Sequence, residues 1–281
     1  MTQIDKSRFE WIGSDSARRE GISRPSTTFW KDAIGRLMKN KVAVVCFFII
    51  VLLILSCIIV PFFSPFESRE QHLGEVNKGF MTVCTDPRYE GQHHVHYFGT
   101  DNLGRDLFLR AFEGGRVSLM IAFAAVFVNL IVGLIYGGIS GYIGGAVDTI
   151  MMRIVEIVNG IPYLIVVILL MMVLPKGIFT MVVAYGITGW TGMARLVRGQ
   201  VLQLKSQEYI VAAEAMGAKS SRIIAKHLIP NALSVIIINV TLAIPSAIFT
   251  EAFLSYIGLG VPVPQPSWGV LAQGGQAVFM T

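Results

Sequence analysis

The residues with the plainest capacity for chemistry are three histidines and a cysteine in one polar segment. His93, His94 and His96 lie close together, a short distance after Cys84. Imidazole and thiolate groups suit zinc or copper. Their spacing matches no standard metal site, however, and a solvated loop is the simpler interpretation. We therefore assign no metal ligand and no catalytic residue from the sequence.

A second candidate is Glu251, a carboxylate inside an apolar stretch that runs from Ala232 to Tyr256. Ionisable side chains inside a membrane are costly and commonly belong to functional sites. The alternative is a structural role in which Glu251 pairs with a partner helix, and both interpretations stay open. With Thr188 and Trp190, Glu251 is our candidate for lining a translocation path.

The composition is that of a membrane protein. Of 281 residues, 53% are hydrophobic and only 15% are charged, with a mean hydropathy of +0.62. Such values are not those of a soluble domain. The apolar stretches contain no histidine and no nucleophile beside a base, which disfavours an intramembrane enzyme. The chain also lacks a G-x-x-x-x-G-K-[ST] phosphate loop, so it has no means of binding ATP in the usual way.

The net charge of +5 is unevenly distributed. Residues 1–41 hold nine Lys/Arg against five Asp/Glu, and residues 195–230 hold six against two, whereas residues 64–116 hold six against eight. The positive-inside rule produces this asymmetry. We therefore expect a cytoplasmic N-terminus and surrounding lipid, and no nucleic-acid partner.

The apolar stretches predict an all-α membrane helix bundle with five spans. We expect spans over 42–60, 117–142, 151–174, 178–199 and 232–256. Pro61 and Pro65 should end the first, Gly160 with Pro162 should kink the third, and Pro245 should interrupt the fifth. The expected regions are a mobile cytoplasmic tail (1–28), an inner-surface amphipathic helix with the first span (29–66), an extracytoplasmic loop (67–114) and a core (115–281) that contains the loop 205–230.

Two features should order the segment around the second span. Asp101 and Gly104 predict a capped turn that places Arg105 and Asp106 before a helix entering the membrane. Within the span, glycines recur every fourth residue on one helix face, where another helix can approach closely. These packing candidates are Gly133, Gly137 and Gly141.

The polar, alanine-rich stretch from Glu208 to Asn231 is unlike the apolar sequence on either side. It predicts two short helices with a corner at Gly217, a residue that accepts a left-handed turn. Ser220 and Ser221 would cap the second helix, and Pro230 would open the next apolar helix. A helical elbow of this kind between two spans is shaped to be held by a partner outside the membrane.

This elbow resembles the EAA loop of permease subunits of ATP-binding-cassette importers, whose pattern is E-A-A, three residues, Gly, nine residues and I-x-L-P. Ala212, Ala213, Gly217 and Pro230 fall on that register. The sequence departs from the pattern at three positions, which are Val211, His227 and Ile229. Nearby carboxylates are Glu208 and Glu214.

Further motifs narrow the resemblance to the second permease subunit of dipeptide and oligopeptide importers, of the type I class. They are WKDAIGRLMKNK, FGTDNLGRD, GGRVSL and SYIGLGVPVPQPSWG, which occur in that order. The similarity covers almost the whole chain from about Phe29. It also implies a sixth span after the last motif, which this sequence does not include.

The resemblance implies a complex in a prokaryotic cytoplasmic membrane. Its other members would be a homologous permease, two ATPase subunits that carry ATP and Mg²⁺, and an extracytoplasmic binding protein that delivers peptide near 101–106 and 262–268. This chain itself would need no cofactor. The helix after Gly217 would insert in a groove on the ATPase. The coupling candidates are Glu208, Ala212, Ala213, Glu214, Gly217, Ala218, Lys219, Arg222, Ile223 and Pro230, with Ile224 and Lys226 beside them.

Other functions are less well supported. The same permease type serves nickel chelates, glutathione and cell-wall peptides, and the sequence does not separate these substrates. A secondary transporter or channel would have no use for the elbow, and such transporters carry more intramembrane charge and paired broken helices. An exporter is disfavoured because the EAA-type loop belongs to importers.

Overall fold

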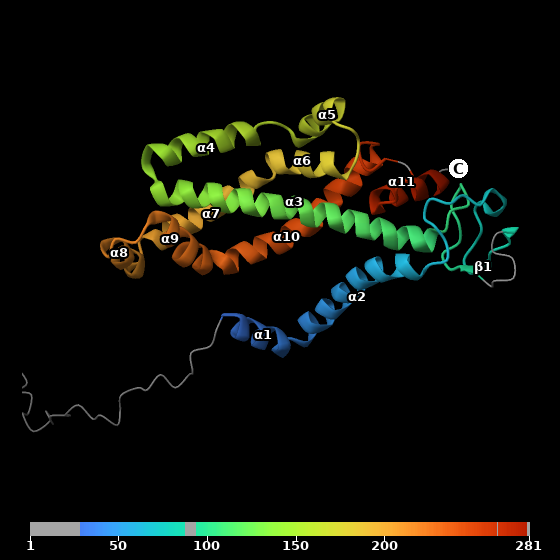
Figure 1. Ribbon diagram of the computed structural model, residues 1–281, viewed down its shortest axis with the longest axis horizontal. Coiled ribbons are helices and arrows are strands. Elements are labelled where there is room, and N and C mark those ends of the chain that lie inside the picture. Colours follow the sequence, from blue (N-terminus) through green and yellow to red (C-terminus); the bar gives the residue numbers. More distant parts are fainter. Residues whose placement is uncertain (1–28, 88–93, 263, 280–281) are drawn as a thin grey trace, which may run out of the picture. The chain divides into compact units, whose positions relative to one another are not determined.

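The computed structural model describes residues 29–87, 94–262 and 264–279 (Figure 1). The predicted tail 1–28 and His93 lie outside the described residues. The chain divides into two compact units, residues 1–53 and 54–281, and each is described by itself. The division falls inside the predicted 29–66 region.

The described part of the first unit contains α1 (Phe29–Lys39) and the beginning of α2 (Lys41–Phe63). In α1, Arg36 pairs with Asp32 one turn earlier at 2.8 Å. Asn40 separates the two helices, and its side-chain oxygen accepts a hydrogen bond from the backbone N–H of Ala43. This is the N-cap bond that starts a new helix.

Helix α2 extends past the predicted end of the first span. It runs to Phe63 and includes Pro61, so the prediction that Pro61 ends the helix is wrong. Proline removes one amide donor and crowds the preceding turn. The helix loses only this one bond at Pro61, and the N–H of Ser64 still donates to the Val60 carbonyl at 3.1 Å.

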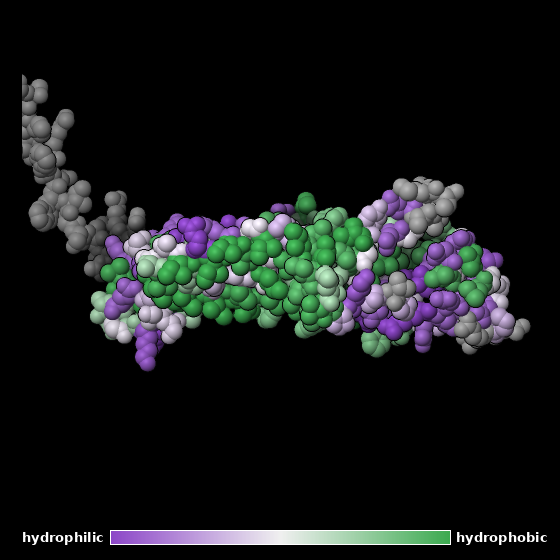
Figure 2. All heavy atoms as spheres, turned by 90° about the horizontal axis from the view of Figure 1, so that it is seen from above, coloured by the Kyte–Doolittle hydropathy of each residue, from purple (hydrophilic) through white to green (hydrophobic). Residues whose placement is uncertain are grey.

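The segment between α2 and α3 has little regular structure. Its described elements are a 3₁₀ turn, η3 (Leu73–Glu75), and two short strands, β1 (Thr82–Val83) and β2 (Val95–His96). The strands pair antiparallel, with Thr82 opposite His96 and Val83 opposite Val95. In Figure 2, polar residues gather over this segment, whereas apolar residues cover the helices of the second unit.

Helix α3 (Leu107–Ile143) begins where the sequence predicted. The Asp101 carboxylate accepts hydrogen bonds from the backbone N–H groups of Leu103 and Arg105, both at 2.9 Å, and Gly104 has a φ of +74°. The Asp106 carboxylate then caps α3 by accepting from the N–H of Leu109 at 2.7 Å. The prediction of a capped turn leading into a helix is confirmed.

The predicted third and fourth spans are each divided into two helices. The third consists of α4 (Gly145–Asn159) and α5 (Tyr163–Val173), with a bend of 76° between them at the predicted kink. The fourth consists of α6 (Ile178–Thr188) and α7 (Trp190–Lys205), which meet at Gly189.

The remaining helices are α8 (Glu208–Ala215), α9 (Ser220–Ile223), a π-helical turn η5 (Ile224–Leu228), α10 (Ile229–Tyr256) and α11 (Trp268–Phe279). Helix α10 passes through Pro245, so the predicted interruption of the fifth span is wrong. The α9, η5 and α10 segments form one continuous helical run over Ser220–Tyr256.

Fewer helices than predicted meet the requirements for a span. Among the described residues, three helical runs are long and apolar enough to cross a membrane, and α4 with α5 makes a fourth if the bent pair is one span. The three are Lys41–Phe63, Leu107–Ile143 and Ser220–Tyr256. The count is below the predicted five because the predicted fourth span is divided at Gly189 and its second half is polar.

Helix α3 lies beside α7 and α10 in the second unit (Figure 1). Its three predicted packing glycines face α7. A Cβ atom on Gly133 would lie 2.6 Å from the Met193 side chain, and one on Gly141 would lie 2.9 Å from the Arg198 carbonyl oxygen. A Cβ on Gly137 would overlap the Ala194 carbonyl oxygen. The two backbones therefore approach too closely for any larger residue.

Candidate coupling loop and translocation path

The elbow turns at Gly217, as the sequence predicted. Helix α8 ends in a Schellman motif, in which the N–H of Ala218 donates to the Ala213 carbonyl at 3.1 Å and the N–H of Gly217 donates to the Glu214 carbonyl at 2.9 Å. Gly217 has a φ of +77°, with nothing within 4 Å of an added Cβ. The constraint at Gly217 is thus backbone conformation and not space.

The second half of the elbow differs from the prediction. Lys219 occupies the N-cap position of α9, and no side-chain cap bond forms. Ser220 and Ser221 are instead the first two residues of the helix, so their predicted capping role is wrong. The helix then continues through the π turn η5 into α10. Pro230 stands in the first turn of α10, as predicted, and the Asn231 side chain donates to the His227 carbonyl at 2.6 Å.

One apolar core holds the elbow to the helices on both sides of it. Its buried members come from α7, α8, α9, η5 and α10, and are Val197, Val201, Ile210, Ile223, Leu228, Ala232 and Ile236. The Ile223 side chain is fully buried, and Ala213 is buried as well. The predicted contact of Ile223 with a partner protein is therefore wrong, because this side chain is used inside the chain.

The exposed face of the elbow presents other residues. Of the predicted coupling residues, those exposed are Glu208, Ala212, Glu214, Gly217, Lys219, Arg222 and Pro230, and Ala218 is half-buried. Three apolar side chains beside them are also exposed, Tyr209, Val211 and Met216, the last with 81% of its surface exposed. The sequence analysis named Val211 only as a departure from the loop pattern and did not name Tyr209 or Met216. We call Tyr209, Val211, Ala212 and Met216 the elbow surface. Met216, an apolar residue beside a turn glycine in a polar stretch, was the signal that could have revealed it.

Polar contacts fix the ends of the helices next to the elbow. The Lys205 ammonium at the end of α7 donates to the Tyr142 carbonyl at 2.5 Å and lies 5.1 Å from that residue's ring. The Asp148 carboxylate, at the start of α4, accepts hydrogen bonds from Nε and from one terminal nitrogen of Arg198, both at 2.5 Å. It also accepts a hydrogen bond from the Ser140 hydroxyl. These bonds tie α3, α4 and α7 together close to the elbow.

Replacing Asp148 with alanine is expected to destabilise this junction by about 1–3 kcal/mol, because Arg198 would lose its bidentate partner. The matched control is Glu156→Ala. It removes the Arg153–Glu156 pair, whose side chains are 71% and 58% exposed, and is expected to change stability by less than about 0.5 kcal/mol. Thermal unfolding of both detergent-solubilised variants checks the difference, and equal effects would contradict it.

The predicted path residues lie inside the chain. Trp190 is buried, with its ring 4.6 Å from that of Tyr136, and Thr188 is half-buried at the end of α6. Glu251 is fully buried and accepts hydrogen bonds from Ser118 and Ser255, both at 2.7 Å. This geometry is that of the structural alternative for Glu251, in which it ties α10 to α3.

An exposed face of α10 carries polar groups that the sequence analysis did not single out. Thr241 and Ser246 are exposed in the middle of this apolar helix, next to the exposed Pro245. Each hydroxyl donates to a backbone carbonyl one turn earlier, Thr241 to Ile237 at 2.8 Å and Ser246 to Leu242 at 3.2 Å. In the sequence, hydroxyl residues within this otherwise apolar stretch could have indicated the polar groups on α10.

The two segments predicted to face a binding protein pack on the start of α3. The Arg110 guanidinium, 2% exposed, donates to the Ser68 carbonyl at 2.9 Å and to the Pro264 carbonyl at 3.5 Å, and its Nε lies 3.7 Å from the Asp101 carboxylate. The Trp268 indole donates to the Ala111 carbonyl at 3.0 Å. Residues 101–106 and 262–268 therefore lie at one end of the second unit.

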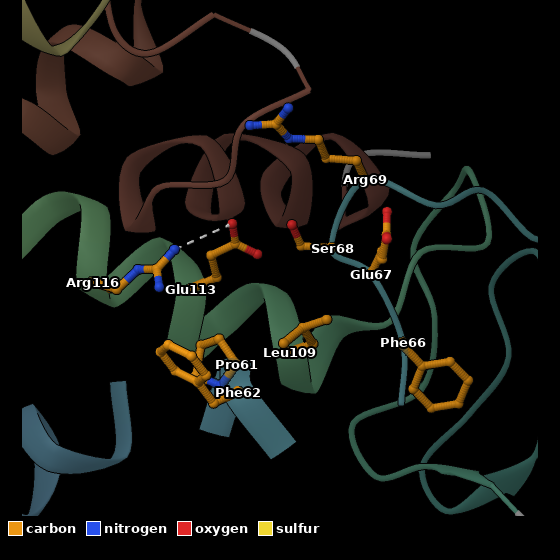
Figure 3. A pocket seen from close by; sticks show the side chains of 9 residues that line it. All are labelled: Pro61, Phe62, Phe66, Glu67, Ser68, Arg69, Leu109, Glu113 and Arg116. Atoms are coloured by element: carbon orange, nitrogen blue, oxygen red, sulfur yellow. Dashed lines mark ion pairs between the residues drawn. The ribbon is translucent and has the colours of Figure 1, made fainter. Parts of the chain in front are cut away.

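A pocket of about 390 Å³ opens near the same end, between the last turn of α2 and the first turns of α3 (Figure 3). Its wall combines aromatic and charged side chains, including an ion pair between Glu113 and Arg116 at 3.8 Å. The lining residues are Pro61, Phe62, Phe66, Glu67, Ser68, Arg69, Leu109, Glu113 and Arg116.

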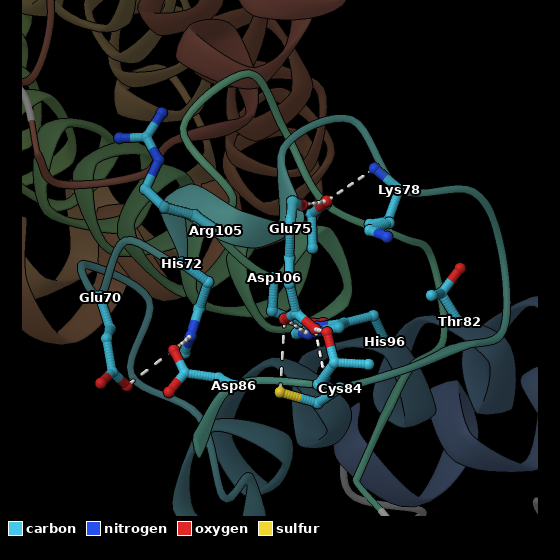
Figure 4. A network of polar contacts seen from close by, with 12 residues as sticks. Glu70, His72, Glu75, Lys78, Thr82, Cys84, Asp86, His96, Arg105 and Asp106 are labelled. Atoms are coloured by element: carbon cyan, nitrogen blue, oxygen red, sulfur yellow. Dashed lines mark hydrogen bonds and ion pairs between the residues drawn. The ribbon is translucent and has the colours of Figure 1, made fainter. Parts of the chain in front are cut away.

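Cys84 and His96 are buried, so the prediction of a solvated loop is wrong for these two residues. They meet at Glu75 (Figure 4). The Cys84 thiol donates to one Glu75 oxygen at 3.3 Å, and His96 Nε2 lies 3.1 Å from the same oxygen. His72, which we did not single out from the sequence, is also buried beside them.

The pKa values of this network follow from burial and hydrogen bonding. Burial raises the pKa of the Cys84 thiol to about 11, so the thiol is protonated at neutral pH. Burial alone would raise the pKa of Glu75, but hydrogen bonds from Thr85, Cys84 and His96 outweigh it and lower the pKa. Burial alone would lower the pKa of His96, but its bonds to Asp106 and Glu75 outweigh it and raise the pKa.

The fold and the elbow together define a class of protein, a multi-span helical membrane protein with an exposed helical loop between two of its long helices. The same fold occurs in the inward-facing MetNI methionine ABC transporter, with a TM-score of 0.50 and 20% identity, over 59% of this chain and 79% of that chain.

Comparison with known families identifies the class further. Residues 129–281 match the family described as binding-protein-dependent transport system inner membrane component. Residues 28–79 match the N-terminal TM domain of oligopeptide transport permease C. The chain belongs to this family of transport permeases.

Three relatives cover almost the whole chain. The oligopeptide transport system permease protein OppC of Bacillus subtilis is 49% identical over 98% of this chain and 86% of that relative. The dipeptide transport system permease protein DppC of the same organism is 47% identical over 93% of this chain and 78% of its own length. The OppC protein of Escherichia coli (strain K12) is 42% identical over 97% of this chain and 86% of its own length.

Proposed function

We propose that this chain is a permease subunit of an ATP-driven importer of dipeptides or oligopeptides. The observation that carries the proposal is the 49% identity to an oligopeptide permease over 98% of the chain. The elbow supports it, because Gly217 forms a sharp corner between two helices that pack on the chain's own core and leaves an exposed surface for a partner.

The complete importer combines this chain with a second homologous permease, two ATP-binding subunits and an extracytoplasmic solute-binding protein. ATP and Mg²⁺ are bound by the ATPase subunits, since this chain has no phosphate loop. The complex lies in the cytoplasmic membrane of a prokaryote. The N-terminus and the elbow face the cytoplasm, in agreement with the excess of Lys and Arg in both regions.

Coupling follows from the way in which the elbow is built. The elbow surface and the charged residues around it, Glu208, Glu214, Lys219 and Arg222, contact the ATPase. A displacement there passes directly to α10, because Ser220–Tyr256 is one continuous helical run. The shared core forces α7 to move with it. Closure of the ATPase pair on ATP thus changes the orientation of rigid helices, and the nucleotide biases which side is open.

The exposed face of α10 around Thr241 and Ser246 is the better candidate for the translocation path. Polar groups in a membrane helix face protein or water in preference to lipid. The buried Trp190 and Glu251 instead maintain the packing of the helices beside this face. On the extracytoplasmic side, residues 101–106 and 262–268 form the docking end for the binding protein.

Uptake by reconstituted vesicles tests the proposal. The tagged chain is purified with the subunits that remain bound, placed in vesicles and supplied with its binding protein and a radiolabelled dipeptide or pentapeptide. We expect ATP-dependent accumulation that unlabelled peptide inhibits and that glutathione and nickel chelates leave unchanged. Uptake of one of those solutes in place of peptide would overturn the substrate assignment. Uptake without any ATPase would overturn the importer itself.

A further inference from the structure

The segment between α2 and α3 has little that would hold it together by packing alone. Its described regular elements are η3 and the two strands of two residues each. Its buried apolar cluster consists of Phe66 and Cys84, together with Leu109 of α3. Small units with small cores are commonly stabilised by disulfides or by a structural metal. A disulfide inside this segment is excluded, because Cys84 is the only cysteine between residues 64 and 106.

The middle of the segment is occupied by metal-ligating side chains. One donor atom from each of His72, Glu75 and Cys84 lies within 4.8 Å of the other two, and all three residues are buried, with 3%, 2% and 9% of their surface exposed. Each residue lies in or next to a short regular element. His72 directly precedes η3, and Glu75 is the last residue of η3. Cys84 directly follows β1, and its N–H donates to the His94 carbonyl at 2.8 Å.

A second histidine adjoins this group. His96 is fully buried, and the pairing of β1 with β2 places it opposite Thr82, two residues before Cys84. Its Nε2 lies 3.1 Å from the Glu75 oxygen that also receives the Cys84 thiol. Two side chains of the kinds that bind zinc, Cys84 and His96, therefore meet at the Glu75 carboxylate (Figure 4), and His72 lies beside them.

Both imidazoles are oriented by an aspartate. Asp86 lies 2.7 Å from Nδ1 of His72, whose Nε2 lies 3.8 Å from the Glu70 carboxylate. Asp106 lies 2.8 Å from Nδ1 of His96. Metal-binding histidines commonly use their second ring nitrogen to contact a carboxylate, which fixes the ring and raises its basicity as a ligand.

We propose that His72, Glu75 and Cys84, with His96 as the fourth ligand, form a structural zinc site in the segment between α2 and α3. This site is separate from the elbow and does not depend on the transported solute. Zinc would cross-link η3 to the β1–β2 pair, and so hold the segment that joins the first two membrane helices.

Zinc binding would draw the donor atoms together. With Zn–N near 2.0–2.1 Å and Zn–S near 2.3 Å, tetrahedral donors lie roughly 3.3–3.8 Å apart, whereas the donor atoms of His72, Glu75 and Cys84 now lie within 4.8 Å of one another. His96 adjoins these three through its Nε2, which lies 3.1 Å from the Glu75 carboxylate. On binding, Cys84 loses its proton to solvent and coordinates as the thiolate. The cation also offsets the negative charge of Glu75, Asp86 and Asp106. The competing account is a metal-free network in which Glu75 accepts all the hydrogen bonds.

Metal titration of the purified chain distinguishes the two accounts. The chain, carrying a histidine-free affinity tag, is stripped with a chelator in detergent and titrated with Co²⁺, which reports thiolate coordination as a charge-transfer absorption band. Zn²⁺ is then added in competition. We expect one Co²⁺ per chain with the thiolate band, displaced by one equivalent of Zn²⁺.

Matched variants locate the site. Cys84→Ser should remove the thiolate band and weaken Zn²⁺ binding by more than about tenfold, whereas Cys57→Ser, at a thiol buried elsewhere, should change neither. Asp86→Asn should keep the band and weaken Zn²⁺ binding roughly 10- to 100-fold. Absence of saturable binding by the unmodified chain would overturn the proposal, even if Cys84→Ser failed to fold. A band that survived in Cys84→Ser would overturn it as well.

Discussion

Gly217→Val is expected to abolish ATP-driven transport while leaving the chain in the membrane. Gly217 has a φ of +77°, a conformation that costs an ordinary L-residue about 1–2 kcal/mol and a β-branched residue more. Valine would therefore open the Schellman turn and displace the elbow surface relative to α9. Because 1.4 kcal/mol corresponds to a factor of about ten in an equilibrium constant, the ratio of correctly folded elbow to its alternatives would fall by about tenfold or more.

Gly217→Asn is the matched control, because asparagine adopts positive φ far more readily than valine. An added Cβ meets nothing within 4 Å at this position, so both variants have room. We expect transport and ATPase co-purification to be retained in Gly217→Asn and lost in Gly217→Val, at equal membrane abundance. Equal transport by the two variants would show that the corner has no part in coupling.

Gly137→Ala is expected to cause the largest loss of folded protein among single-methyl substitutions in α3. The added Cβ would overlap the Ala194 carbonyl oxygen and approach Val197 at 2.9 Å. A backbone oxygen cannot move out of the way as a side chain can, so α3 and α7 must separate. Overpacking of a tight core typically costs about 1–3 kcal/mol, and this contact should fall at the upper end.

The control for Gly137→Ala is Gly199→Ala on α7, where nothing lies within 4 Å of the added Cβ. Alanine is a better helix former than glycine by roughly 1 kcal/mol, so this variant should be neutral or slightly stabilised. Thermal unfolding in detergent measures both variants. If Gly137→Ala unfolded at the same temperature as the unmodified chain, this result would contradict the close contact between α3 and α7 at Gly137.

The sequence was most informative where a local pattern determines local structure. The capped turn at Asp101 and the corner at Gly217 were predicted because each depends on hydrogen bonds between residues that are close in sequence. Local rules were misleading where neighbouring elements decide the outcome. Pro245 should break a helix by its own chemistry, yet α10 continues through it, with α10 packed on α3 and α7.

In the candidate sites, too, local sequence did not determine which residues lie together. Ile223 has the composition of a docking residue, but its burial depends on Val197 and Ile210, which lie on other helices. Glu251 was equally open to two roles until the fold placed Ser118 beside it. In the segment between α2 and α3, His72 joins Cys84 and His96 only through the fold, so the adjacent His93 and His94 were the more visible candidates.

Photo-crosslinking from Met216 tests the central claim most directly, namely that the elbow binds an ATPase subunit. A benzophenone amino acid replaces Met216, which is 81% exposed on the elbow, and in a control it replaces Phe249, which is 76% exposed in α10. Both variants are irradiated in membranes that transport. We predict a covalent product with the ATPase subunit from position 216 and none from position 249. A transporting complex that gives no ATPase product from position 216 would contradict the assignment of the elbow as the coupling loop.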